Sequence, residues 1–184
     1  MVRAWVVSAA LVCGIALGSW VIRAALRPKP AAAQAGLTSQ QQAQVAMLQR
    51  RLQQDSTDLG AVLELANFYY DLGRFADAVP LYRRYLAADP GQAEVRIDYA
   101  YALFASGAEE AGIAELRRVL ERFPDHPIAL FNLGVLLAQR GELEAARQSF
   151  RELIRLHPTL PISQRAQRAL RMLDSLEQST TTLR

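Results

Sequence analysis

The sequence predicts an all-α protein, in which an apolar N-terminal transmembrane helix precedes an α-solenoid of three helical hairpins. Residues 4–22 carry no charge and no proline, as a membrane-spanning helix requires. Further along the chain, glycine and proline recur at a spacing of 34 residues, and apolar residues fall at helical spacing between them. Hydrophobic residues make up 51% of the 184 residues, which is enough to bury a core.

Residues 1–27 are predicted to be a membrane anchor. As a helix, residues 4–22 would extend about 28 Å, close to the hydrocarbon thickness of a bilayer. Trp5 and Trp20 lie at the two ends, where aromatic rings prefer the membrane interface. A cleaved signal peptide is disfavoured because the nearest small-x-small site, Ala33–Ala35, follows a basic, proline-containing stretch. We expect a single pass through a bacterial inner membrane, with a possible homodimer through the GxxxG pair Gly14 and Gly18.

The basic residues are concentrated beside this segment. The formal net charge of the chain is +3, and without the four N-terminal basic residues it becomes −1. These four residues are Arg3, Arg23, Arg27 and Lys29. The remainder has no concentrated cationic face, so nucleic acid is not an expected partner.

Three units of 34 residues follow, at 59–92, 93–126 and 127–160. The phased positions are Gly73, Gly107 and Gly141, then Pro90, Pro124 and Pro158. Small residues recur in both helices of each unit, at Ala66, Ala100 and Gly134, and at Ala78, Gly112 and Ala146. Each unit predicts a helix, a turn whose glycine adopts positive φ, a second closely packed helix, and a proline that follows it. Pro80 would be tolerated only near the first turn of its helix.

The segments around the repeats complete the expected domain order. A linker at 28–38 leads to a leader helix at 39–58, with Ser39 as its N-cap. A capping helix at 161–178 precedes a disordered tail at 179–184. Arg165, Arg168 and Arg171 form the outer face of that capping helix and offer a second surface, suited to acidic partners.

The three phased units resemble the tetratricopeptide repeat family, although Val62, Arg96 and Leu130 stand where its signature has tryptophan. This resemblance implies a concave groove, lined by the first helices, that binds a protein or peptide partner. Carried over to this chain, the groove residues are Leu63, Asn67, Tyr70, Ile97, Tyr101, Phe104, Phe131 and Val135. Their apolar and aromatic character favours a hydrophobic peptide or helix. The lysine and asparagine clamp that some members use for C-terminal carboxylates is missing, and Asp98 would repel a carboxylate.

The sequence offers no basis for catalysis, a cofactor or a metal site. Cys13 is the single cysteine, and His126 and His157 occupy loops between repeats without a recognisable motif. We therefore expect a membrane-tethered interaction scaffold that serves in assembly or maturation, and not an enzyme.

Two alternatives stay open. The anchor and the leader helix around Leu48 and Leu52 resemble the membrane-anchored repeat subunits of bacterial cytochrome c maturation, the haem-lyase accessory proteins. This resemblance implies a periplasmic domain, and we expect that orientation, whereas the charges flanking the anchor slightly favour a cytoplasmic one. A regulatory subunit of a membrane enzyme is the alternative from another functional class.

Overall fold

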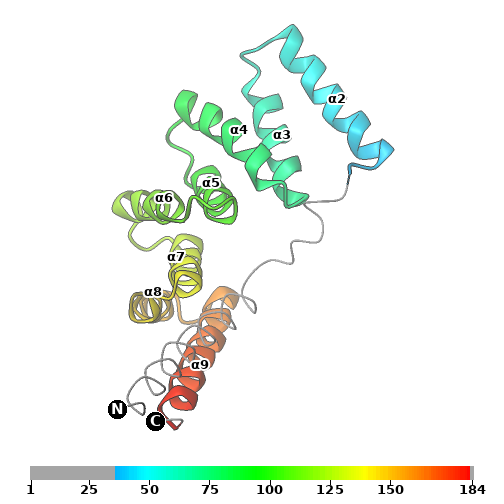
Figure 1. Ribbon diagram of the computed structural model, residues 1–184. Coiled ribbons are helices and arrows are strands. Elements are labelled where there is room, and N and C mark those ends of the chain that lie inside the picture. Colours follow the sequence, from blue (N-terminus) through cyan, green and yellow to red (C-terminus); the bar gives the residue numbers. More distant parts are fainter. Residues whose placement is uncertain (1–35, 183–184) are drawn as a thin grey trace, which may run out of the picture. The chain divides into compact units, whose positions relative to one another are not determined.

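The computed structural model describes residues 36–182, and every regular element in that range is an α-helix (Figure 1). The helices are α2 (Ser39–Gln54), α3 (Leu59–Asp71), α4 (Phe75–Ala88), α5 (Ala93–Ala105), α6 (Glu109–Arg122), α7 (Pro127–Arg140), α8 (Leu143–Leu156) and α9 (Pro161–Thr182). The predicted all-α class is confirmed for this range. The predicted anchor, with its span 4–22 and with Gly14 and Gly18, lies outside the described residues. Among residues 36–182, no helix has both the length and the apolar character needed to cross a membrane.

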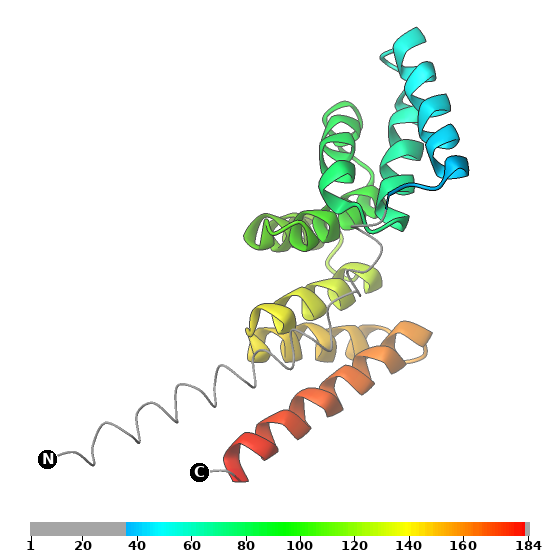
Figure 2. The ribbon, with the colours of Figure 1, turned by 45° about the vertical axis from the view of Figure 1, so that its right-hand side comes forward.

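Within the described range, the chain divides into two compact units, residues 36–132 and residues 133–182, and the boundary falls inside α7. In the first unit, α2 lies along α3, α3 pairs with α4, α4 also packs on α5, and α5 pairs with α6 (Figures 1 and 2). In the second unit, α8 packs against α9. The pairing of α3 with α4 and of α5 with α6 matches the predicted hairpins.

The turn inside each hairpin has the glycine conformation that the sequence predicts. Gly73, Gly107 and Gly141 have φ angles of 69°, 100° and 91°, where a Cβ atom would be strained. After α3, the Gly73 N–H donates to the Tyr70 carbonyl, and the Arg74 N–H donates to the Tyr69 carbonyl, both at 2.8 Å. This pair of bonds is a Schellman motif, and it recurs at Gly107 and Gly141. The 34-residue period is therefore a period in backbone geometry as well as in sequence.

The small residues mark where the two helices of a hairpin approach each other closely. A Cβ atom added at Gly112 of α6 would lie 2.5 Å from the carbonyl oxygen of Ala100 on α5. At Gly134 of α7, it would lie 2.6 Å from the ring of Phe150 on α8. The alanines at equivalent positions have no exposed surface, and they are Ala66, Ala78, Ala100 and Ala146. Pro90, Pro124 and Pro158 are exposed just beyond the ends of α4, α6 and α8.

Three local expectations were wrong. The N-cap of α2 is Thr38 and not Ser39, because Thr38 and Gln41 form a reciprocal capping box between side chain and backbone. Helix α9 continues to Thr182, so it extends beyond the predicted end at 178 and includes residues predicted to be disordered. Pro80 lies inside α4, beyond its first turn, and the helix continues through it.

Two arginines connect neighbouring helices of the array. Arg96, which replaces the signature tryptophan of the second repeat, pairs through Nη1 with Glu115 Oε2 of α6 at 2.6 Å. Arg147 of α8 is only 3% exposed and donates to the Leu173 carbonyl of α9 at 3.2 Å. Arg147 thus connects the capping helix α9 to α8 of the last repeat.

Candidate functional site: an aromatic and acidic face on the first helices

An aromatic cluster connects the first two repeats. Tyr70 of α3 lies 5.3 Å from Phe75 and 6.2 Å from Tyr82, both of α4, measured between ring centroids. Tyr101 of α5 lies 5.8 Å from Tyr70 and 5.5 Å from Phe75. Most of these rings meet edge to face, an arrangement in which the positive edge of one ring meets the negative face of the next. Tyr70 and Tyr101 belong to the first helices of successive repeats, and their rings lie side by side.

Tyr82 and Asn67 hold the cluster in place. Tyr82 has no exposed surface, and its hydroxyl donates to Asn67 Oδ1 at 2.8 Å. Burial raises the pKa of Tyr82 and of Tyr70 far above the ordinary value, with the Asp98 charge as the next cause. Burial also raises the pKa of Tyr101. The three hydroxyls therefore stay neutral, and that of Tyr82 donates the hydrogen bond to Asn67.

Carboxylates border these rings. Glu94, Asp98 and Tyr101 follow one another at spacings of four and three residues on α5, so they share one face of that helix. Asp71 directly follows Tyr70 on α3. Burial, then the charges of Asp71 and Glu94, raise the pKa of Asp98 from its ordinary value of 3.8 to about 6. The site thus combines aromatic rings with a half-buried carboxylate whose charge is unfavourable in the free protein.

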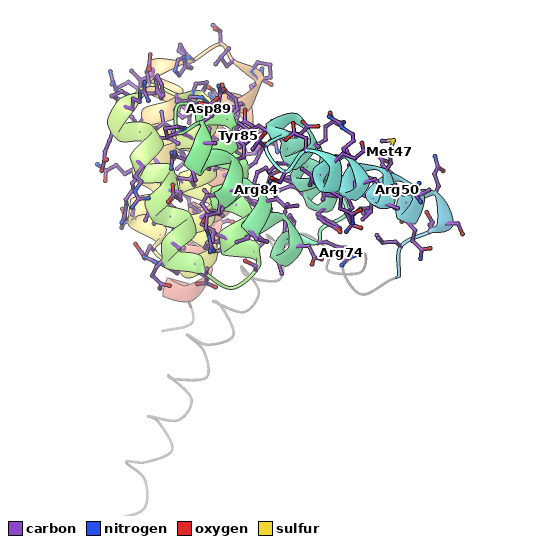
Figure 3. All side chains as sticks on the ribbon, turned by 90° about the horizontal axis from the view of Figure 1, so that it is seen from above. Met47, Arg50, Arg74, Arg84, Tyr85 and Asp89 are labelled. Atoms are coloured by element: carbon purple, nitrogen blue, oxygen red, sulfur yellow. The ribbon has the colours of Figure 1, made fainter. Side chains whose placement is uncertain are left out.

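We call these residues the first-helix face: Tyr70, Asp71, Glu94, Asp98 and Tyr101, together with Phe131, which is included as the groove residue predicted for the third repeat. All belong to the unit of residues 36–132 and are exposed or half-buried. Phe131 lies on α7, the first helix of the third repeat. Figure 3 labels side chains of the other elements of this unit, Met47 and Arg50 on α2 and Tyr85 on α4.

The predicted groove residues occupy different environments. Asn67 is exposed, whereas Leu63, Tyr70, Tyr101 and Phe131 are half-buried. Ile97 and Phe104 are only 2% and 8% exposed, so they pack into the interior beneath the face. Val135 is half-buried in the unit of residues 133–182. The surface within residues 36–132 is therefore less apolar than the predicted strip.

The sequence interpretation treated this surface as apolar and aromatic, and it gave too little weight to the acids that border the rings. In that interpretation, Asp98 was considered only as a residue that would repel a carboxylate, and Phe75 was not considered. The spacing of Glu94, Asp98 and Tyr101 was the available signal, because it places three polar or aromatic groups on one helical face. The neighbourhood of Asp71 was not available, because it depends on how two hairpins pack.

The histidine at the start of α7 has a local structural role. His126 Nδ1 accepts a hydrogen bond of 3.4 Å from the Ala129 backbone N–H, in the first turn of the helix. Its Nε2 lies 3.7 Å from Glu94 Oε1. Among the described residues, no group of three or more histidine, cysteine, aspartate or glutamate side chains is placed to hold a metal ion.

Stacked helical hairpins with phased glycine turns and an exposed face on their first helices define a helical-repeat interaction protein. Two tetratricopeptide repeat models match the chain, over residues 71–122 and 110–161. The chain belongs to the tetratricopeptide repeat family.

Known proteins with similar structures share the fold at low identity. A crystal structure of MamA aligns with a TM-score of 0.59 and 18% identity, covering 75% of this chain and 89% of that one. A tetratricopeptide repeat protein from Parabacteroides merdae aligns with a TM-score of 0.62 and 15% identity, covering 73% and 53%. The DnaJ homolog subfamily C member 3 of Bos taurus is 25% identical over 122 residues, 66% of this chain. The match spans only 24% of that relative's length.

Proposed function

We propose that this protein is a membrane-tethered scaffold that binds a peptide segment or helix of a partner protein on its first-helix face. The observation that carries the proposal is the ring contact between Tyr70 and Tyr101, which joins two first helices into one aromatic surface. Aromatic side chains that are already held in place lose little conformational freedom on binding, and they dominate the energetics of many interfaces. The tetratricopeptide repeat assignment supports a role in protein interactions.

The test uses the full-length chain, purified in mild detergent, and a displayed library of random peptides as the probe. Selected peptides are then synthesised and their affinities measured by fluorescence anisotropy. We expect Tyr101→Ala combined with Phe131→Ala to weaken binding at least about thirtyfold, because truncating an aromatic hot spot costs about 2 kcal/mol or more. Circular dichroism should show unchanged helicity.

Two further variants make the test specific. Tyr85→Ala removes a half-buried tyrosine from α4, a second helix, and should leave the affinity nearly unchanged. Replacing Arg165, Arg168 and Arg171 with alanine removes the exposed cationic surface of α9. Binding that survives the aromatic double substitution, and is lost in moderate salt or in the arginine variant, would assign the site to α9 instead.

The tether and the pathway are further parts of the proposal. Residues 4–22 support the anchor by their length, their lack of charge and their terminal tryptophans. The cytochrome c maturation role requires the repeat domain to face the periplasm. A topology reporter fused to the C-terminus would separate that role from a cytoplasmic one, including regulation of a membrane enzyme from the cytoplasmic side.

A further inference from the structure

We propose that the first-helix face receives a cationic side chain, an arginine or lysine of the partner segment, against the rings of Tyr70 and Tyr101 and the carboxylate of Asp98. This proposal rests on the function proposed above and specifies the chemistry of its ligand. It differs from the expectation of a purely hydrophobic ligand, because the exposed part of this surface carries acids beside its rings.

Geometry brings the two required groups together. Asp98 and Tyr101 lie three residues apart on one face of α5, and Tyr70 of α3 is in ring contact with Tyr101. A guanidinium or ammonium group is attracted to the face of an aromatic ring, and more strongly where water is partly excluded. A carboxylate beside that ring supplies the opposite charge. An arginine side chain, which is planar and carries several donors, can satisfy both groups at once.

The described part of the chain does not supply this cation itself. Arginines elsewhere in the first unit pair with nearby acids: Arg51 with Asp58, Arg74 with Asp77, and Arg96 with Glu115. Among residues 36–175, by contrast, no basic side chain lies within ion-pair distance of Asp71 or Asp98.

Glu94 completes the negative charge of this surface. Among the described residues, the basic side chain that approaches it is His126, whose Nε2 lies 3.7 Å from Glu94 Oε1 and is charged only when the imidazole is protonated. Glu94 is 73% exposed, so water screens its charge and it remains accessible to a partner.

The charge balance selects one class of partner. Burial and the charges of Asp71 and Glu94 raise the pKa of Asp98 to about 6, so the free face holds its negative charge at a cost. A bound cation would relieve that cost, whereas the carboxylate of an acidic tail would increase it. The partner segment is therefore a basic one.

The experiment is a chemical double-mutant cycle on a peptide selected with the library described above. The peptide is synthesised in two forms, one with arginine and one in which citrulline, a neutral residue of almost the same shape, replaces that arginine. On the protein side, Asp98→Asn removes the charge and preserves the shape of the side chain. We expect Asp98→Asn to weaken the arginine peptide about tenfold, and to change the citrulline peptide little.

A matched control separates this pair from the general field of the protein. Glu121→Gln removes one exposed carboxylate from α6, outside the first-helix face, and should leave both affinities nearly unchanged. Equal effects of Asp98→Asn on the arginine and citrulline peptides would overturn the proposal. An absence of enriched arginine or lysine among peptides that depend on Tyr101 would also overturn it.

These outcomes are distinguishable from failure of the proposed function. If peptides bind and depend on Tyr101 and Phe131 but not on Asp98, the interaction face stands and its cationic ligand is rejected. If no selected peptide depends on Tyr101 and Phe131, the proposed function itself is rejected.

The chain's own basic residues before the described range are a competing occupant. We expect replacement of Arg23, Arg27 and Lys29 with glutamine to leave the peptide affinity unchanged. A large gain in affinity would show that this segment already fills the face, and would overturn the assignment to a partner.

Discussion

Asp98 lies half-buried on α5, and it bears the clearest electrostatic cost of the first-helix face. Its pKa in the folded chain is about 6, above the ordinary 3.8, because burial and the Asp71 and Glu94 charges oppose ionisation. The folded state therefore holds the proton more tightly than the unfolded state. Its stability should fall as the pH rises from about 4 to about 6, and the full cost should persist above that range.

We expect Asp98→Asn to raise the free energy of unfolding relative to the parent chain at about pH 7.5. The gain should be about 1 kcal/mol, less than the full pKa shift implies because water still screens the carboxylate. The gain should shrink toward pH 4.5, where the parent side chain is protonated. Urea unfolding at both pH values measures the difference, and an equal effect at both would contradict the assigned cause.

At the residue scale, the sequence predicted which helical face a side chain lies on, but not how deeply that side chain is buried. The resemblance to the tetratricopeptide repeat family placed Ile97, Tyr101 and Phe104 in the groove, and the structure buries Ile97 and Phe104. Helical periodicity gives the direction of a side chain about its own axis. How far a neighbouring hairpin covers that side chain depends on tertiary packing, which a single sequence does not specify.

At the element scale, the close approach of paired helices depends on glycine at two equivalent crossings. In isolation, Gly→Ala should stabilise a helix by about 1 kcal/mol, so any net loss measures the clash. At Gly112, the added methyl group would meet the Ala100 carbonyl oxygen, a backbone atom that cannot move alone. At Gly134, it would meet the Phe150 ring, a side chain that can shift.

We therefore expect Gly112→Ala to destabilise the chain by about 1–3 kcal/mol, and Gly134→Ala to cost less. Chemical unfolding of the two variants, followed by circular dichroism, compares them directly. The larger Gly134→Leu should be strongly destabilising, because the Phe150 ring is only 1% exposed and a shift that accommodates a methyl group would not accommodate a leucine side chain. Stabilisation by Gly112→Ala would contradict the close helix crossing.

Most helices could be predicted because the signals that begin and end them are local. Gly73, Gly107 and Gly141 end the first helices through backbone geometry that glycine alone adopts easily. One helix start was predicted wrongly, because two similar neighbouring residues can each serve as its N-cap. Thr38 and Ser39 are both good N-caps, and each is followed three residues later by a glutamine, so the sequence offers the same capping box twice. In the structure the box forms at Thr38, whose backbone N–H donates to the Gln41 side chain.

At the scale of the whole molecule, the repeat period predicted the architecture because each hairpin needs a neighbour to bury its apolar face. That argument gives the order and pairing of hairpins within each unit. It does not give the ligand, since Asp71 and Asp98 approach only through packing of α3, α4 and α5. The predicted anchor depends on different physics, the transfer of residues 4–22 into a bilayer, and it has its own test.

We expect the intact chain to stay with the membrane fraction after alkaline carbonate extraction, whereas residues 37–184 alone should be extracted and remain helical. An uncharged segment of this length gains enough from the hydrocarbon to stay inserted, and each arginine at its centre costs about 2.5–3.5 kcal/mol. Val12→Arg with Ile15→Arg should therefore release the chain. The same substitutions at Ala25 and Leu26, beyond the span, should not. Recovery from cells of a mature chain that begins at Gly36 would instead establish a cleaved signal peptide.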